Sequence, residues 1–148
     1  MIAGYLTRSV GLLAALGLAL GLTVVVGTPA EAGAGSDYLN KGERLYHGQR
    51  IWREVAGYNN AELVMQSDGN LVLYSYGPVE TRVCWASNTQ GSGGAFVEYQ
   101  QDGNLVIYNG DYRPVWSSNT AGTGGTNTNI NYHGQVWVGD TALTPYCT

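Results

Sequence analysis

The sequence predicts an all-β fold, and two observations lead to that expectation. First, the composition is rich in residues that favour short strands and tight turns, with 22 glycines, 11 tyrosines and 4 tryptophans among 148 residues. Second, the chain after residue 33 shows no extended helical period. It contains instead segments whose residues alternate in character, as the two faces of a β-strand do.

The N-terminus is predicted to be a secretory signal peptide covering residues 1–32. Arg8 precedes an apolar stretch from Val10 to Val26, and Ala30-Glu31-Ala32 supplies a small-x-small cleavage pattern. An uncleaved transmembrane anchor is the alternative, since the stretch nearly reaches spanning length. Cleavage would leave one secreted domain, residues 33–148, that does not insert into a membrane.

A nine-residue segment from Gln66 to Tyr74 is repeated almost unchanged at residues 100–108. In both copies Gln, Asp, Asn, Val and Tyr occupy every second position, so an extended backbone would place them on one face and the intervening residues toward a core. Amides, a carboxylate and a phenol around a small apolar patch suit a polyhydroxyl ligand. The candidate binding residues are therefore Gln66, Asp68, Asn70, Val72 and Tyr74 in the first copy, and Gln100, Asp102, Asn104, Val106 and Tyr108 in the second.

Asp-Gly in each copy predicts a hairpin turn, because glycine adopts positive φ without strain. A three-residue loop from Asp68 to Asn70 would place Gln66 opposite Val72, although an unbroken strand would divide the residues into the same two faces. The aspartate side chains are expected to face solvent and to contribute little to stability.

A second repeated segment sets the spacing of the repeats. Residues 85–94 begin Trp-Ala-Ser-Asn-Thr and residues 116–125 begin Trp-Ser-Ser-Asn-Thr. The second nine-residue segment starts 15 residues after Trp85, and the same spacing counted from Trp116 predicts a third copy at residues 131–139. There the ligand-type positions hold Asn131, His133, Gln135, Trp137 and Gly139, so the third copy is degenerate. Gln90–Gly94 and Ala121–Asn129 are expected to be inter-repeat turns, and the first repeat has three extra residues in the loop that contains Gly77-Pro78.

Both nine-residue segments match the signature Gln-x-Asp-x-Asn-x-Val-x-Tyr, and from about Ser36 onward the chain resembles the bulb-type, mannose-binding lectins of monocot plants. That family also occurs in fungi and bacteria, and the chain looks like a secreted, bacterial-type member. The resemblance implies a β-prism of three four-stranded sheets with pseudo-threefold symmetry, in which Trp85 and Trp116 are core tryptophans. Segment 39–51 looks like the family's first strands, and its apolar residues would close the third sheet.

The resemblance also implies a role for each motif position. Asp and Asn would hold the axial 2-hydroxyl of mannose, Gln the 3-hydroxyl and Tyr the 4-hydroxyl, while Val would pack on the ring carbons. The expected partner is mannose or a mannose-containing glycan, with a homodimer left open. The alternative to a binding site is a plain hairpin turn with a solvated strand face. The alternative function is that of a lectin-like bacteriocin, although such proteins usually contain two lectin domains in tandem.

The charged residues exclude other classes of function. The net charge is −4, and it stays −4 without residues 1–32 because Arg8 and Glu31 are both removed. The absence of a basic stripe argues against nucleic acid. A glycosidase needs two carboxylates about 5–9.5 Å apart, whereas Asp68 and Asp102 belong to separate repeats. Neither histidine has a partner at metal-ligand spacing, so no enzyme, metal or cofactor is expected.

The two cysteines, Cys84 and Cys147, both lie in the part expected to be exported. An even cysteine count in an oxidising compartment predicts a disulfide between them, with two unrelated buried thiols as the alternative.

Overall fold

The computed structural model describes residues 35–55 and 59–147, which form twelve β-strands and no helix. No helix in these ranges is long and apolar enough to cross a membrane. The predicted signal peptide, residues 1–32, lies outside the described residues. The strands are β1 (Tyr38–Asn40), β2 (Arg44–Tyr46), β3 (Arg50–Val55), β4 (Asn59–Met65), β5 (Leu71–Tyr76), β6 (Thr81–Ala86), β7 (Gly94–Tyr99), β8 (Leu105–Asn109), β9 (Pro114–Ser117), β10 (Asn127–Ile130), β11 (Val136–Val138) and β12 (Thr141–Ala142).

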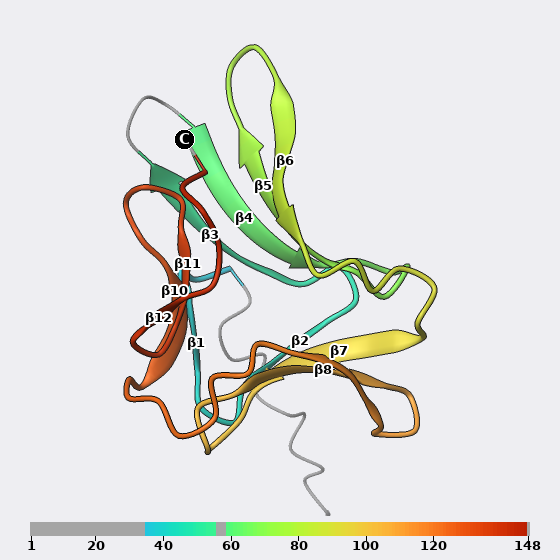
Figure 1. The fold of residues 1–148 in the computed structure, drawn as a ribbon. Coiled ribbons are helices and arrows are strands. Elements are labelled where there is room, and N and C mark those ends of the chain that lie inside the picture. Colours follow the sequence, from blue (N-terminus) through green and yellow to red (C-terminus); the bar gives the residue numbers. More distant parts are fainter. Residues whose placement is uncertain (1–34, 56–58, 148) are drawn as a thin grey trace, which may run out of the picture.

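The strands form three antiparallel sheets of four strands each. Their orders are β3-β4-β5-β6, β2-β7-β8-β9 and β1-β10-β11-β12, and we call them the first, second and third sheet after the repeat that each contains. Figure 1 shows the three sheets as the sides of a prism around a shared interior. The predicted all-β prism is confirmed.

The N-terminal segment contributes one strand to each sheet. β1 pairs with β10, β2 with β7 and β3 with β4. The prediction that the apolar residues of segment 39–51 close the third sheet is therefore wrong for two of them: Leu39 does so, whereas Leu45 and Ile51 complete the other two sheets. Gly42 and Gly48, with φ of 86° and 80°, allow the chain to turn between successive sheets.

The register of the first hairpin differs from the prediction: the turn lies one residue earlier, so the residue opposite Val72 is shifted by two. Val64, not Gln66, lies opposite Val72. The turn is closed by a hydrogen bond from Gln66 N to Asn70 O of 2.8 Å, so its loop is residues 67–69. Asn70 therefore belongs to the closing pair, where its side chain meets the neighbouring strand. The predicted division into two faces is unaffected, because side chains still alternate along each strand.

The core is built from the residues between the motif positions. Leu63, Met65, Leu71 and Leu73 of the first sheet are at most 1% exposed and pack with their counterparts from the other two sheets. Trp85 and Trp116 pack against this core from β6 and β9, and their rings contact each other edge to face with centroids 5.7 Å apart. The tryptophans are half-buried, so they form the rim of the core between two sheets.

The predicted disulfide between Cys84 and Cys147 is present, with Cα atoms 5.5 Å apart. It joins β6 of the first sheet to the segment that follows the third sheet. In the chain-entropy model, closing a loop of 63 residues stabilises a fold by about 4 kcal/mol.

The inter-repeat segments are more ordered than the sequence suggested. Gly94 begins β7 and residues 127–129 lie in β10, so the predicted turns are shorter than expected. Glycine and asparagine are typical of turns, so the composition did not predict these strands, which pair through backbone atoms. Between the strands, Gly91 N donates to Asp68 O and Gly122 N donates to Asp102 O, both at 2.8 Å. Each inter-repeat turn is thus bonded to the hairpin turn of the motif that precedes it.

Candidate functional site

Each intact motif folds into a turn that its own aspartate stabilises. Asp68 Oδ1 accepts a hydrogen bond from Asn70 N at 3.0 Å, and Asp102 Oδ1 accepts one from Asn104 N at 2.9 Å. One carboxylate oxygen therefore orders the turn, and the other is left for a ligand on an exposed side chain. The aspartates do face solvent, as predicted, but the expectation that they contribute little to stability overlooked this bond.

The motif asparagine is held by residues outside the motif. In the first repeat, Asn70 Oδ1 accepts hydrogen bonds from Ser87 Oγ at 3.0 Å and from Thr89 N at 3.2 Å. The Thr89 hydroxyl, which is buried, donates to Gly69 O at 2.7 Å. These bonds occupy the amide oxygen and direct the Nδ2 group outward, where no other described residue bonds to it.

The second repeat has the same arrangement. Asn104 Oδ1 accepts from Ser118 Oγ and from Thr120 N, both at 3.1 Å, and Thr120 Oγ1 donates to Gly103 O at 2.7 Å. Here Asn104 Nδ2 also has Ser117 Oγ at 3.3 Å. Sequence analysis missed these positioning residues, although the repetition of Ser-Asn-Thr after each tryptophan was the available signal.

Glutamine and tyrosine complete the polar face. Gln66 Nε2 donates to Tyr74 Oη at 2.6 Å, and Gln100 Nε2 donates to Tyr108 Oη at 2.5 Å. Each bond leaves the glutamine Oε1 as an acceptor and the tyrosine hydroxyl proton as a donor. The motif valine lies between asparagine and tyrosine on the same face, but it is only 3% exposed in both copies. A ligand would therefore meet a mainly polar surface with a small apolar floor.

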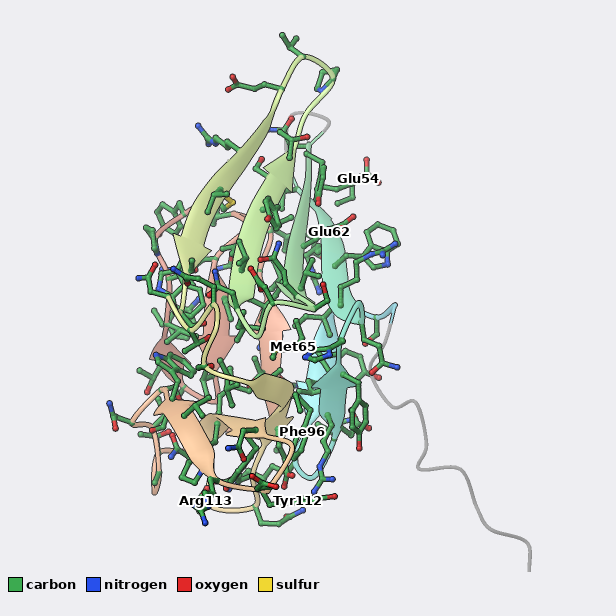
Figure 2. All side chains as sticks on the ribbon, turned by 90° about the vertical axis from the view of Figure 1, so that its right-hand side faces the viewer. Glu54, Glu62, Met65, Phe96, Tyr112 and Arg113 are labelled. Carbon is green, nitrogen blue, oxygen red and sulfur yellow. A yellow bond between two sulfur atoms is a disulfide. The ribbon has the colours of Figure 1, made fainter. Side chains whose placement is uncertain are left out.

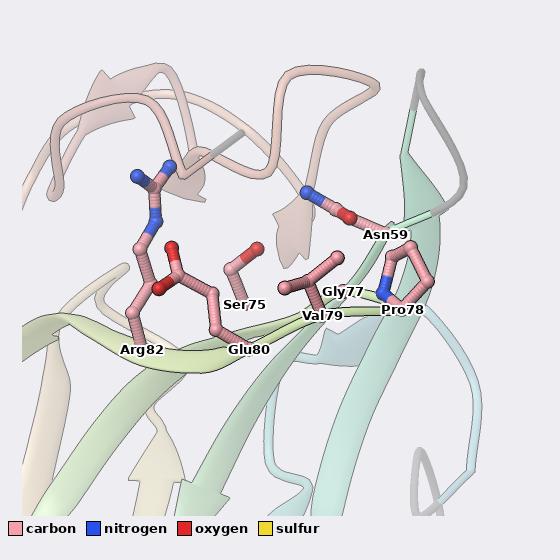
Figure 3. A pocket seen from close by; sticks show the side chains of 7 residues that line it. All are labelled: Asn59, Ser75, Gly77, Pro78, Val79, Glu80 and Arg82. Atoms are coloured by element: carbon pink, nitrogen blue, oxygen red, sulfur yellow. The ribbon is translucent and has the colours of Figure 1, made fainter.

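The arrangement matches a ligand that both donates and accepts hydrogen bonds. Each intact repeat offers a carboxylate oxygen, an amide N–H group, an amide oxygen and a phenol on one shallow face. Charge-assisted bonds to the carboxylate are the strongest of this set. The site lies outside the hollow of about 270 Å³ on the first sheet, which is lined by Asn59, Ser75, Gly77, Pro78, Val79, Glu80 and Arg82 (Figure 3).

The two intact sites differ in the residue beside the motif tyrosine. In the first sheet Tyr74 lies opposite Glu62, whereas in the second sheet Tyr108 lies opposite Phe96. Tyr74 contacts Tyr76 at a centroid distance of 5.7 Å, and Tyr108 stacks on Phe96 at 5.5 Å. Burial, followed by the nearby Glu62 carboxylate and Tyr74, raises the pKa of Tyr76. The first site has an acidic neighbour and the second an apolar one.

The third repeat keeps the turn but not the arrangement of polar side chains. Asn131 N donates to Gln135 O at 2.9 Å, and Gly134 has positive φ, as in the other two turns. However, Asn131 Oδ1 now accepts from His133 N and Gln135 N, which replaces the aspartate bond. Gln135 is bonded to Thr144 O through Nε2 and to the Trp137 indole through Oε1, both at 2.9 Å. The side chain at the asparagine position is thus bonded within the protein.

The C-terminal segment covers this third turn. Cys147 N donates to His133 O at 3.0 Å, and the His133 and Tyr146 rings lie 5.2 Å apart. Among residues 35–55 and 59–147, no group of three or more His, Cys, Asp or Glu side chains is arranged to hold a metal ion.

No family model matches the chain, but individual proteins of known sequence and structure are similar to it. A mannose-specific lectin of Galanthus nivalis is 42% identical over 67 residues, which is 44% of this chain and 40% of that protein, so the chain spans about two-fifths of this relative's length.

Two solved structures extend the similarity. The snowdrop (Galanthus nivalis) mannose-specific agglutinin, complexed with methyl-α-D-mannoside, has a TM-score of 0.58 and 35% identity, covering 72% of this chain and 91% of that one. Tarin lectin bound to trimannose has a TM-score of 0.54 and 33% identity, covering 69% and 86%. These similar proteins are lectins, which bind carbohydrate and are not enzymes.

Proposed function

This chain belongs to the family of bulb-type mannose-specific lectins, and we propose that it binds mannose or mannose-containing glycans through its first and second repeats. The observation that supports the proposal is the duplicated set of polar groups described above. In both repeats one aspartate oxygen is bonded within the turn and the asparagine amide oxygen is bonded to a serine of the neighbouring strand or loop, and the other polar groups of the motif are left for a ligand.

The proposed contacts follow the motif positions. Asp68 and Asn70 would hold the axial 2-hydroxyl of mannose, since a carboxylate accepts the hydroxyl proton while the amide N–H donates to its oxygen. Gln66 would accept from the 3-hydroxyl, and Tyr74 would bond the 4-hydroxyl. The second repeat would use the same positions. Glucose has an equatorial 2-hydroxyl, so it would lose the two strongest contacts.

The affinity of each site for one sugar should be low. The sites are shallow and solvent-exposed, and a dissociation constant near 1 mM would correspond to about −4 kcal/mol. Two sites on different sides of a prism would instead gain affinity on branched or polymeric glycans, where the first contact raises the effective concentration for the second. We therefore propose a role in glycan capture at surfaces.

We also propose that the mature protein is secreted. Residues 1–32 have the order expected of a cleaved signal peptide, and a disulfide of this kind is typical of oxidising compartments. The intact mass of exported protein should correspond to a chain that starts near Gly33. Exported protein that still contained residues 10–26 would contradict this proposal.

Calorimetric titration tests the binding function. The protein should bind methyl α-mannoside and should bind methyl α-glucoside at least tenfold more weakly. Asp68→Ala combined with Asp102→Ala should abolish mannoside binding while circular dichroism still reports the folded state. A double variant that bound mannoside like the parent would overturn the assignment of both sites. Growth inhibition of related bacteria by the parent would instead support the bacteriocin alternative.

A further inference from the structure

A cluster of aromatic rings adjoins the second site, whereas at the first the motif tyrosine contacts Tyr76 and no ring corresponds to Phe96 or Tyr112. Phe96 lies at its centre, only 4% exposed, with Tyr108 stacked on it at 5.5 Å. Tyr46 and Tyr112 contact the same ring at 5.6 Å and 5.5 Å. Figure 2 shows Phe96 and Tyr112 together on the second sheet. The motif tyrosine is therefore connected through one buried ring to two partly exposed ones.

Tyr112 has a backbone conformation that its side chain does not favour. Its φ is 58°, in the left-handed region, where the other non-glycine residues of the described chain are Asn88 and Asn119. Asparagine tolerates this region, whereas a bulky residue there is uncommon. The hairpin is otherwise well formed, since Asn109 Oδ1 accepts from Asp111 N and Arg113 N at 3.0 Å and 2.9 Å. Asparagine would suit this backbone better, so the aromatic ring is the property that distinguishes tyrosine at position 112.

The ring of Tyr112 is held in place but remains accessible. The Arg44 guanidinium lies over the Phe96 ring at 4.5 Å and over the Tyr112 ring at 5.7 Å, and Arg44 is ion-paired with Glu98 at 2.6 Å. Despite these contacts Tyr112 is 65% exposed. An exposed aromatic ring that is already ordered binds an apolar surface with little loss of conformational freedom.

The first repeat lacks the two rings, Phe96 and Tyr112, that extend this surface away from the motif tyrosine. Glu62 takes the place of Phe96, and Trp52 lies opposite it as Tyr46 lies opposite Phe96. The tip of the corresponding hairpin is formed by residues 77–80, where Val79 is 94% exposed and no aromatic residue occurs. The two intact repeats therefore share the polar site and differ in what flanks it.

We propose that Tyr112 forms a subsite of the second repeat that stacks against a second sugar ring linked to the mannose. The inference rests on the proposed function, because the subsite extends that same site. Two ring contacts of 5.5 Å each connect Tyr108 through Phe96 to Tyr112, a reach suited to the next residue of an oligosaccharide. The apolar C–H face of a pyranose matches the face of an aromatic ring. The second site is thus selective for linked mannose, and the first site binds single terminal residues.

The test measures each site separately with mono- and disaccharides. In an Asp68→Ala background only the second site is active, and in an Asp102→Ala background only the first. We would titrate each with methyl α-mannoside and with α1-2-, α1-3- and α1-6-linked mannobiose. The second site should bind at least one mannobiose about five- to tenfold more tightly than the monosaccharide, and the first site should show no such gain.

Variants at residue 112 identify the group responsible. Tyr112→Asn suits the left-handed backbone and removes the ring, so the disaccharide gain should fall to about onefold. Tyr112→Phe should retain it, and Val79→Asn, at the tip of the first hairpin, should leave both sites unchanged. A gain that persisted in Tyr112→Asn, or a parent without any gain, would overturn the subsite. Loss of monosaccharide binding in both backgrounds would instead contradict the proposed function and the subsite with it.

Discussion

All three repeats share the same backbone turn, but only the first two present the same set of polar side chains. Gln66 to Asn70, Gln100 to Asn104 and Asn131 to Gln135 are closed by the same hydrogen bond, at 2.8, 2.8 and 2.9 Å, and each turn has a glycine at positive φ. In the first two the asparagine amide is held outward by serine and threonine. In the third, Gln135 is bonded to Thr144 and Trp137.

This difference separates what the fold requires from what the proposed sugar site requires. The closing bond and the glycine are present in all three repeats, so they belong to the fold. The aspartate, the outward amide and the glutamine–tyrosine pair occur in only two repeats, so we assign them to the proposed site. The third repeat has in addition the C-terminal segment, which Cys147 ties to Cys84. Breaking each group of contacts should therefore have a different effect.

The largest expected effect comes from the disulfide that anchors the third turn. Cys84→Ser combined with Cys147→Ser should lower the free energy of unfolding by about 4 kcal/mol. Because Cys147 N also donates to His133 O, amide exchange should rise first in the third turn. Denaturant titration and hydrogen exchange measure both quantities, and the parent under reducing conditions is the control. Unchanged stability would show that the loop closure contributes little.

The motif asparagine should affect binding and stability together. Asn104→Ala removes the acceptor for Ser118 Oγ and Thr120 N, and unsatisfied polar groups of this kind cost about 1–3 kcal/mol. Thermal melts should show this loss, and mannoside titration should show that the second site no longer binds. Gln135→Ala in the third repeat is the matched control, which should leave mannoside binding unchanged. Full stability in Asn104→Ala would mean that the amide oxygen is not a structural acceptor.

A smaller effect is expected from the residues that position the asparagine. Thr89→Val removes the hydroxyl that donates to Gly69 O while preserving the shape of the buried side chain. The free energy of unfolding should fall by about 1 kcal/mol. Mannoside affinity at the first site should also fall, although Thr89 would not touch the sugar. Thr120→Val should do the same at the second site, and a change confined to stability would rule out a positioning role.

The smallest effect is expected at the position that replaced aspartate in the third repeat. His133→Ala should leave monosaccharide binding at its parental value, because the turn bond there comes from Asn131 and the ring contacts Tyr146. Calorimetry with methyl α-mannoside makes the comparison. Weaker binding in this variant would show that the third repeat contributes to recognition.

Much of this architecture could be predicted from local pattern. The alternation of residues 63–74 determined which side chains face the core, and the repeated tryptophan segment located the third turn. The distribution of Leu39, Leu45 and Ile51 over three sheets could not be predicted, because the short strands of Leu39 and Leu45 pair with β10 and β7, which are far away in sequence. The two-residue difference in the pairing of Val72 arose because Asn70 closes the turn instead of lying within it.

The most direct test of two competent sites and one lost site is a residue-resolved NMR titration of the parent with methyl α-mannoside. Backbone amide signals of Asn70 and Tyr74, and those of Asn104 and Tyr108, should shift and saturate, while the amide of Gln135 should not move. Side-chain amide signals of Asn70 and Asn104 should follow the same curves, because their Nδ2 groups are the proposed donors. Shifts at Gln135 that saturate with the others, or no shift at either intact motif, would contradict the account.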